Sequence, residues 1–350
     1  MVNWGVIGLG RIAWVFCNAV QFSKRGQVRA VASRRPDRAK AFAQALSIPT
    51  AYESYDALLA DDSVHAVYVA TMTPGHLEWV IRAARARKHI LVEKPMGMNH
   101  RETFAMIAAA KEHDVFLMEA LMYRCHPQTQ KLAALIQQKV IGDVIRVRSA
   151  FGFRATPDAR SRLFDHALAG GSIMDIGCYP VSAARLVAGA ATGAAFLDPV
   201  AVKGTAIVGE TGVDHQAAVL LEFKGGIIAE IGTSITCELP GEIAVFGSAG
   251  TLRVPNPWLA STLCFFADRP VPRDAAFPGG VIELRRGKDV QMIEIGVDRD
   301  LYTYQADMAA DHITGRQAPA VSWSDSDGNA RVLDEWRRQA GLRFPQDDAQ

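Results

Sequence analysis

One segment near the start of the chain restricts the fold more than any other, because it runs from a strand through a tight turn into a helix. The apolar residues 4–7 lead into Gly8-Leu9-Gly10-Arg11-Ile12-Ala13, which fits the pattern G-x-G-x-x-A. Gly8 suits the tight turn, Gly10 lets backbone approach a pyrophosphate, and Ala13 lets the helix pack closely on the strand. The N–H groups that begin the helix suit phosphate oxygens. The segment therefore predicts a dinucleotide-binding turn.

The end of the second predicted strand favours NADP over NAD. Residues 28–32 lead into Ser33-Arg34-Arg35, where an acidic residue would normally hold the ribose 2′-hydroxyl of NAD. Ser33 is suited to a 2′-phosphate, and the guanidinium of Arg34 to pairing with its charge or stacking on adenine. Arg38 adds positive charge nearby. The alternative interpretation treats Arg34 and Arg35 as solvated loop charges.

Residues 2–122 alternate short apolar runs with amphipathic helical segments, which predicts an N-terminal Rossmann domain over residues 1–122. Such alternation is typical of a doubly wound parallel sheet, whose strands end at one edge where a dinucleotide lies. The predicted strands are near 4–7, 28–32, 66–70, 89–92 and 115–118.

Two polar segments follow strands at this edge. The first is Thr71-Met72-Thr73-Pro74-Gly75-His76, whose hydroxyls and backbone suit the cofactor; His76 opens a helix, and a solvent-facing position is its alternative. The second is Glu93-Lys94-Pro95, which places a lysine beside the nicotinamide ring and a carboxylate near its ribose. The predicted cofactor contacts are Gly8, Gly10, Arg11, Ile12, Ser33, Arg34, Arg38, Thr71, Thr73, Pro74, His76, Glu93 and Lys94.

From residue 123 the pattern predicts an α+β domain over 123–350, with one broad, mostly antiparallel open sheet. Its last helices, near 302–315 and 326–341, would pack back near the domain junction. One face of such a sheet is covered by helices and the other is free for a twin, so we expect a homodimer through the sheet. After a helix at 127–139, the predicted strands are 143–153, 201–208, 216–224, 227–235, 242–247, 251–254, 281–285 and 290–295.

A second group of polar residues lies in the segment Gly170-Gly171-Ser172-Ile173-Met174-Asp175-Ile176-Gly177-Cys178-Tyr179-Pro180. Asp175 and Tyr179 are four residues apart, so a helix that opens at Gly171 projects both from one face. Pro180 indicates a kink or a restart of the helix. The alternative makes Asp175 a partner of the helix dipole and Tyr179 a core residue.

The composition of the chain agrees with an enzyme and argues against a protein that binds nucleic acid or a membrane surface. The 350 residues are 49% hydrophobic, enough for two cores, and a net charge of +1 with interspersed acids and bases argues against binding to nucleic acid or a membrane surface. A strand beginning near residue 2 leaves no room for a signal peptide, so we expect a cytoplasmic protein. The scattered cysteines lack metal-ligand spacing, and we expect no metal; they are Cys17, Cys125, Cys178, Cys237 and Cys264.

Together, the glycine-rich turn, the Glu-Lys-Pro turn and the G-G-x-x-x-D-x-G segment resemble the glucose–fructose oxidoreductase, inositol dehydrogenase and rhizopine-catabolism family over nearly the whole chain. Many members carry His four residues after the Asp, whereas this chain has Tyr179 there. Together with the segment 118–127, this is similar to the subgroup that contains dimeric dihydrodiol dehydrogenase and NADP-dependent D-xylose dehydrogenase. The resemblance implies that Lys94 and Tyr179 face the reacting carbon and that Pro95 follows a cis peptide.

The implied reaction moves a hydride between the nicotinamide and a carbinol or carbonyl carbon of a cyclic sugar or polyol, with NADP as cofactor and NAD as the alternative. Tyr179 would be the acid or base, and a cationic Lys94 nearby would lower its pKa from about 10. Asp175 would orient a ring hydroxyl. The predicted substrate contacts are Lys94, Arg124, Phe153, Arg162, Asp175 and Tyr179.

Two alternatives stay open at this point. One is a glycosidase or isomerase that retains NAD(P) and uses transient oxidation. The other is a non-catalytic NADP-binding sensor, although Lys94, Asp175 and Tyr179 argue against it, because a sensor does not need a proton relay.

Overall fold

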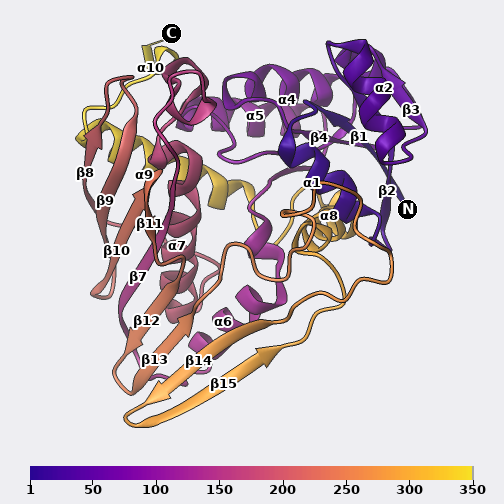
Figure 1. Ribbon diagram of the computed structural model, residues 1–350. Coiled ribbons are helices and arrows are strands. Elements are labelled where there is room, and N and C mark those ends of the chain that lie inside the picture. The colour runs from indigo at the N-terminus through magenta and orange to yellow at the C-terminus, as the bar shows by residue number, and fades with distance from the viewer. Residues whose placement is uncertain (349–350) are drawn as a thin grey trace.

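The computed structural model describes residues 1–348 and contains two sheets (Figure 1). The first has six parallel strands in the order β3-β2-β1-β4-β5-β6, which is the Rossmann order. Its inner strands are apolar on both faces, as burial beneath helices on both sides requires. The strands are β1 (Val2–Ile7), β2 (Gly26–Ala32), β3 (Thr50–Tyr52), β4 (Ala66–Val69), β5 (His89–Val92) and β6 (Leu117–Glu119).

The second sheet has nine strands in the order β15-β14-β13-β12-β7-β10-β9-β8, with β11 also paired to β7. All its pairs are antiparallel except β7 with β10. Its strands are β7 (Val144–Arg154), β8 (Ala201–Val208), β9 (Asp214–Phe223), β10 (Ile227–Ser234), β11 (Thr236–Leu239), β12 (Ile243–Gly247), β13 (Gly250–Val254), β14 (Gly280–Arg286) and β15 (Asp289–Ile295).

Helices cover one face of the second sheet and connect it to the first. Helix α7 packs on β7, α9 on β8, and α6 on β14, while α9 also contacts α5, and α8 contacts α1 (Figure 1). The helices are α1 (Arg11–Val20), α2 (Pro36–Ala45), α3 (Tyr55–Leu59), α4 (His76–Arg85), α5 (His100–Glu112), α6 (Pro127–Gln137), α7 (Cys178–Thr192), α8 (Leu301–His312), α9 (Trp323–Gln339) and α10 (Pro345–Asp348).

Side-chain caps fix where the helices at the junction begin. Asn99 accepts a hydrogen bond from the N–H of Glu102 at the start of α5, and Ser322 accepts one from Asp325 at the start of α9. Asp300 caps α8 by accepting from Tyr302. Each cap satisfies an N–H group that the helix itself leaves free. The chain therefore enters each helix at a defined residue.

The expected fold class is confirmed, and most strand positions agree to within one or two residues. The short strands β3 and β11 and the α-helix α3 were not predicted. Both short strands depend on one neighbouring strand for pairing rather than on an apolar pattern of their own. The division of the chain after residue 122 stays a prediction; it falls just after β6, at the start of the 3-10 turn η2 (Met122–Cys125).

Among the helices of residues 1–348, none is long and apolar enough to cross a membrane.

Candidate active site

Gly8 and Gly10 of the first turn are each needed as glycine, but for different physical reasons. Gly8 has a φ of +86°, and a Cβ there would lie 2.6 Å from the backbone of Ala70, so the protein's own packing requires glycine. Gly10 has an extended backbone, and a Cβ there would meet no protein atom within 4 Å. The absence of a side chain at Gly10 therefore keeps open a space in front of the N-terminus of α1. That space fits the pyrophosphate of a dinucleotide.

The residues predicted to bind the 2′-phosphate of NADP lie at and just after the end of β2, beside this turn. Ser33 is buried and its hydroxyl oxygen accepts a hydrogen bond from the N–H of Arg35, which leaves its proton available to a ligand. Arg34 is exposed. Arg38 donates a hydrogen bond to the carbonyl of Leu9, so its guanidinium lies against the glycine-rich turn.

Arg11 does not point freely toward a cofactor. Its guanidinium donates to the carbonyls of Phe265 and Ala267 and pairs with Asp268. Three more side chains of α1 and its end hold the same segment, so residues 265–271 cross α1 as a strap; they are Trp14, Asn18 and Gln21. Ile12 is half-buried against the core. The structure thus gives Arg11 a contact with the second half of the chain that the sequence did not predict.

His76 is buried rather than solvent-facing. Its Nδ1 lies 3.2 Å from the carbonyl of Pro95 and 3.1 Å from that of Met96, and its Nε2 lies 3.1 Å from the carbonyl of Thr71. Burial lowers the pKa of the imidazole, which favours the neutral form. His76 therefore joins the loop after β4 to the turn that carries Lys94. Next to it, the hydroxyl of Thr71 is buried without a protein partner, as a group that binds a ligand would be.

Glu93 and Lys94 follow β5, and the Lys94–Pro95 peptide is cis, as the resemblance implied. One oxygen of Glu93 accepts a hydrogen bond from the hydroxyl of Tyr68, and burial raises the pKa of this carboxyl. Lys94 donates to the backbone carbonyl of Asp175, and its Nζ lies 3.6 Å from the carboxylate of that residue. The turn after the parallel sheet therefore contacts the second half of the chain through Lys94.

Asp175 is buried but paired. Arg162 lies 3.0 Å from the carboxylate oxygen that also faces Lys94. Burial opposes ionisation, but the charges of Lys94 and Arg162 outweigh it and lower the pKa of Asp175 below its usual value. The carboxylate is thus ionised at neutral pH, and it holds both Lys94 and Arg162 at one of its oxygens.

A π-helical turn, η5 (Ile173–Gly177), presents Asp175 and leads directly into α7, which carries Tyr179. This agrees with the restart that Pro180 indicated, and π turns are frequent at functional sites. The turn is anchored by the buried Asp214, which accepts hydrogen bonds from the hydroxyl of Ser172 and the N–H of Ile173. Burial raises the pKa of the Asp214 carboxyl to about 6. Both predicted residues thereby face Lys94, whose Nζ lies 5.2 Å from the centre of the Tyr179 ring.

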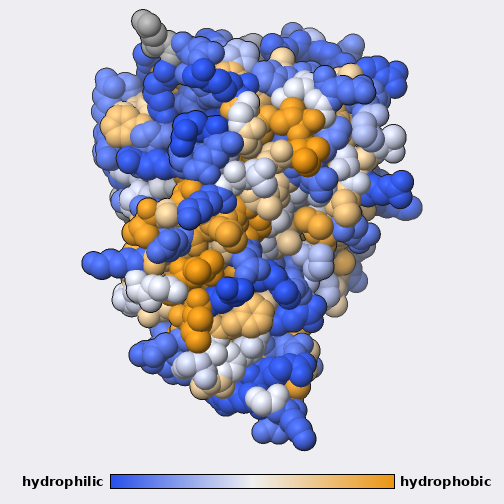
Figure 2. Space-filling model, turned by 90° about the vertical axis from the view of Figure 1, so that its left-hand side faces the viewer, coloured by the Kyte–Doolittle hydropathy of each residue, from blue (hydrophilic) through white to orange (hydrophobic). Residues whose placement is uncertain are grey.

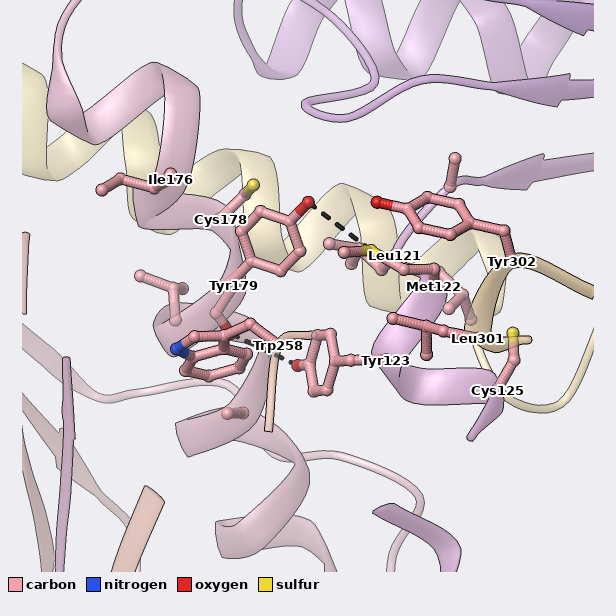
Figure 3. Close-up of a cluster of buried hydrophobic side chains, with 14 of the residues drawn as sticks. Leu121, Met122, Tyr123, Cys125, Ile176, Cys178, Tyr179, Trp258, Leu301 and Tyr302 are labelled. Atoms are coloured by element: carbon pink, nitrogen blue, oxygen red, sulfur yellow. Dashed lines mark hydrogen bonds between the residues drawn. The ribbon is translucent and has the colours of Figure 1, made fainter. Parts of the chain in front are cut away.

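The expectation that Lys94 lowers the pKa of Tyr179 is wrong for this arrangement. Burial raises that pKa well above its usual value, and nearby anionic groups, including Glu93 and Asp175, raise it further. Lys94 is engaged with Asp175, and the Tyr179 hydroxyl donates instead to the sulfur of Met122 at 3.5 Å (Figure 3). At neutral pH the phenol therefore keeps its proton.

Arg124 does not line this site, contrary to the prediction. It lies in η2, and its buried guanidinium pairs with Asp325 at 2.8 Å and donates to the hydroxyl of Ser182. Arg185 pairs with the same Asp325 at 2.6 Å. Because burying a charge is costly unless it is paired, this network accounts for Arg124 without a substrate.

Aromatic rings surround Tyr179, and the sequence indicated only part of them. Phe153 is half-buried on β7, but Phe151, two residues earlier, lies 5.4 Å from the Tyr179 ring, and Trp258 lies 5.8 Å from it. Trp258 belongs to the loop between β13 and β14, far along the chain, where no local motif marked it. Phe151 and Trp258 therefore give Tyr179 aromatic neighbours, and Figure 3 shows Trp258 close to Tyr179.

Glu119 is a second residue that the sequence analysis did not single out. It ends β6 and is buried, accepting hydrogen bonds from the N–H of Met96 at 3.0 Å and from the hydroxyl of Ser326 at 2.7 Å. It therefore holds the turn of Lys94 against α9. Burial raises the pKa of this carboxyl to about 7. An acidic residue at the end of an otherwise apolar strand was the available signal.

Within residues 1–348, no group of three or more metal-ligating side chains gathers, and the five cysteines are free thiols. Three features do converge. They are the open space at Gly10, the unpartnered hydroxyl of Thr71, and the group formed by Lys94, Asp175 and Tyr179. All three lie at the carboxyl ends of the parallel strands or face them. This arrangement defines an NAD(P)-binding oxidoreductase.

Comparison with protein families places the chain in one of them. Residues 2–121 match the model described as "Oxidoreductase family, NAD-binding Rossmann fold", and residues 129–253 match the "GFO/IDH/MocA C-terminal domain". The chain belongs to the GFO/IDH/MocA oxidoreductase family, which confirms the resemblance.

Relatives cover the whole chain. Trans-1,2-dihydrobenzene-1,2-diol dehydrogenases of Mus musculus and Homo sapiens are each 33% identical, over 99% of both chains. A 3-ketoreductase from Actinomadura kijaniata, crystallised with NADP and TDP-benzene, matches with a TM-score of 0.82 and 26% identity over 97% of this chain and 98% of that one. An aldose-aldose oxidoreductase from Caulobacter crescentus, complexed with glycerol, matches with a TM-score of 0.83 and 25% identity over 97% of each chain.

The two glycines provide a matched test of the cofactor site. We expect Gly10→Ala to leave the free energy of unfolding of the cofactor-free protein within about 1 kcal/mol of wild type, while weakening NADP binding at least about tenfold because the new methyl fills the pyrophosphate space. Gly8→Ala should instead lose more than about 2 kcal/mol of stability. Urea unfolding and fluorescence titration with NADP measure both. Unchanged NADP affinity in Gly10→Ala would contradict this position for the pyrophosphate.

The raised pKa of Glu119 predicts that the free energy of unfolding depends on pH. A carboxyl whose pKa rises on folding binds more protons in the folded state, so stability falls as pH rises from about 4.3, its unfolded value, toward about 7. Glu119→Gln keeps the acceptor for Met96 and removes the ionisation. We expect the stability difference to move in favour of this variant by up to about 3 kcal/mol between about pH 5 and pH 8. Urea unfolding curves at both values test this.

Glu335→Gln is the control for this comparison, because hydrogen bonds from Arg338 and Gln339 lower the pKa of Glu335 to about 2. Its stability difference from wild type should stay constant over the same pH window, since that carboxyl titrates only at lower pH. A constant difference for Glu119→Gln as well would show that Glu119 is already ionised below this window.

Proposed function

We propose that this protein is an NADP-dependent oxidoreductase that interconverts a carbinol and a carbonyl carbon on a cyclic sugar or polyol. The observation that carries the proposal is the convergence of Lys94, Asp175 and Tyr179 beside the edge of the parallel sheet where Gly10 leaves space for a dinucleotide. A lysine beside a carboxylate and a phenol supplies the proton transfer and hydroxyl orientation that such a reaction needs. The relatives' names, a diol dehydrogenase, a 3-ketoreductase and an aldose-aldose oxidoreductase, support the same reaction and substrate class.

In this proposal the cofactor, when bound, supplies or accepts the hydride. Tyr179 handles the matching proton at its hydroxyl oxygen. Since burial holds its pKa above the usual value, Tyr179 carries a proton at neutral pH and is ready to donate it to a carbonyl oxygen. Oxidation of a carbinol requires the deprotonated phenol, so its rate should rise with pH. Burial at the site keeps water from competing for the proton.

Lys94, Asp175 and Arg162 would position the substrate. Lys94 is only slightly exposed, and its ammonium group is held by the Asp175 carbonyl and carboxylate. Arg162 is half-exposed and pairs with the same carboxylate oxygen. Adjacent hydroxyls on a ring suit this cluster of one carboxylate and two cations, while Phe151 offers an apolar surface for the ring itself. Phe153 stays a predicted substrate contact on the same strand.

We propose NADP rather than NAD because Ser33, Arg34 and Arg38 stand where a 2′-phosphate would lie and no carboxylate is among them. The relative from Actinomadura kijaniata was crystallised with NADP. We also propose a cytoplasmic location, which the free thiols support. None of the relatives named above is a retained-cofactor hydrolase or a sensor, so we do not carry those alternatives further.

Initial rates test the proposal. With NADP and a panel of aldoses, inositols and cyclic trans-diols, we expect turnover that rises with pH in the oxidative direction. Lys94→Met and Tyr179→Phe should each reduce kcat at least about 100-fold, because each removes a group at the reacting carbon, while NADP affinity in Tyr179→Phe stays within about threefold. Lys40→Met and Tyr304→Phe, which alter residues outside the site, are the controls. Full activity in both site variants would contradict the proposal.

We further propose that a second copy of the chain covers the open face of the second sheet. Figure 2 shows apolar side chains gathered on the side where β8, β9 and β10 lie. Ile207, Leu220 and Ile228 are exposed there, and Ala218 and Gly232 keep the face flat between them. A flat, apolar sheet face suits a twin related by twofold symmetry.

Leu220→Glu tests the dimer. Burying a carboxylate in an apolar interface is costly, so we expect this variant to elute as a monomer where wild type elutes as a dimer, measured by size exclusion with light scattering. Phe104→Glu, on α5, introduces the same charge at an exposed apolar residue away from the sheet and should stay dimeric. A monomeric wild type, or a dimer that survives Leu220→Glu, would contradict this interface.

A further inference from the structure

Tyr302 is a buried phenol at the site that no part of the proposed reaction uses. It lies in the first turn of α8, where the carboxylate of Asp300 fixes the backbone by accepting hydrogen bonds from the N–H groups of Tyr302, Leu263 and Cys264. Asp300 itself is fully buried. The direction of the Tyr302 side chain is therefore set by a rigid helix start rather than by a mobile loop.

The Tyr302 hydroxyl faces the hydroxyl of Tyr179. Figure 3 shows the two groups pointing toward one another above the sulfur of Met122, from helices that enter the site on opposite sides. Tyr302 is 2% exposed, and its ring is parallel to that of Phe265 at 6.5 Å. Burial raises the pKa of Tyr179, and an ionised Tyr302 would raise it further, so the two phenols lie within electrostatic range of each other.

Proton donation by Tyr179 leaves a phenolate in a buried site, and the partners described so far stabilise it poorly. The sulfur of Met122 accepts hydrogen bonds but has none to donate. Lys94 is bound to Asp175, 5.2 Å from the centre of the Tyr179 ring. A buried anion without a donor is costly, and a neutral phenol facing it is a donor.

We propose that Tyr302 donates a hydrogen bond to the Tyr179 oxygen and thereby stabilises the phenolate that forms when Tyr179 gives its proton to the substrate. The proton that leaves Tyr179 goes to the carbonyl oxygen, and Tyr302 keeps its own proton throughout. Tyr302 is thus a positioning residue that acts through Tyr179. The inference rests on the proposed function and adds a second phenol to its site.

Charge repulsion keeps this division of roles fixed. Two adjacent phenolates repel, so once one hydroxyl ionises the other stays neutral and donates. Burial raises the pKa of Tyr302, and the carboxylates of Glu93 and Asp300 raise it further, so Tyr302 itself stays neutral. Several neighbouring strands, turns and helices place titratable groups around the two phenols. These groups are Tyr68, Glu93, Lys94, Tyr123, Asp175, Cys178, Cys264 and Asp300.

Tyr302→Phe tests the proposal, because it keeps the ring that packs on Phe265 and removes only the hydroxyl. We expect kcat for oxidation near neutral pH to fall about tenfold and the rising limb of its pH profile to move upward by about one unit, since a hydrogen bond to an anion has been lost. NADP affinity should stay within about twofold. Tyr304→Phe, two residues along α8 and bonded to Asp298 outside the site, should leave the profile unchanged.

A rate and pH profile like wild type in Tyr302→Phe would overturn the proposal. A loss of NADP affinity with an unmoved profile would overturn it too, because it would make Tyr302 a cofactor contact. A second measurement does not require turnover: the alkaline tyrosinate absorbance that is lost in Tyr179→Phe should titrate at higher pH when Tyr302 is Phe. If wild type reacts with no substrate of the panel, the proposed function fails, while this titration still decides whether the two hydroxyls interact.

Discussion

The buried carboxylate of Asp175 is the contact on which the site depends. An unpaired carboxylate at this depth would be strongly unfavourable, so its pairing with Lys94 and Arg162 fixes all three groups. Lys94 comes from the turn after β5, and Asp175 from the π turn before α7. The pair therefore joins the edge of the parallel sheet to the helix layer of the second sheet, and it sets the distance between Lys94 and the ring of Tyr179.

The turn that carries Lys94 is held from two further sides. His76 binds the carbonyls of Pro95 and Met96 from α4, and Glu119 binds the N–H of Met96 from β6 while contacting α9 through Ser326. Three independent elements thus determine where one ammonium group lies. Such support is what a reaction with two coupled transfers requires, because small displacements of a reacting group are costly in rate. Burial keeps Tyr179 neutral, which suits a proton donor.

The sequence predicted the parts of this site that depend on local chain geometry. The glycine-rich turn, the Glu-Lys-Pro turn and the Asp175–Tyr179 pair each follow from a strand end or a helix start, and strand order then brings them together. The prediction that Arg124 contacts the substrate failed because the direction of its side chain depends on η2 and on a buried partner, Asp325, far along the chain. Trp258 and Tyr302 were not found because a loop and a later helix return them to the site without a motif of their own. The pKa of Tyr179 was misjudged because burial, which outweighs the lysine, is not visible in spacing.

Direct transfer of hydrogen between cofactor and ring carbon is the central claim, and isotope labelling tests it. Reduced NADP carrying deuterium at the transferred position of nicotinamide C4 would be mixed with the protein and a cyclic carbonyl substrate in light water, and the product analysed by mass spectrometry and NMR. The account predicts one deuterium on the new carbinol carbon and none on oxygen after exchange, with no incorporation in Tyr179→Phe on the same timescale. Deuterium that appears in the solvent, or a product reduced without label, would contradict it.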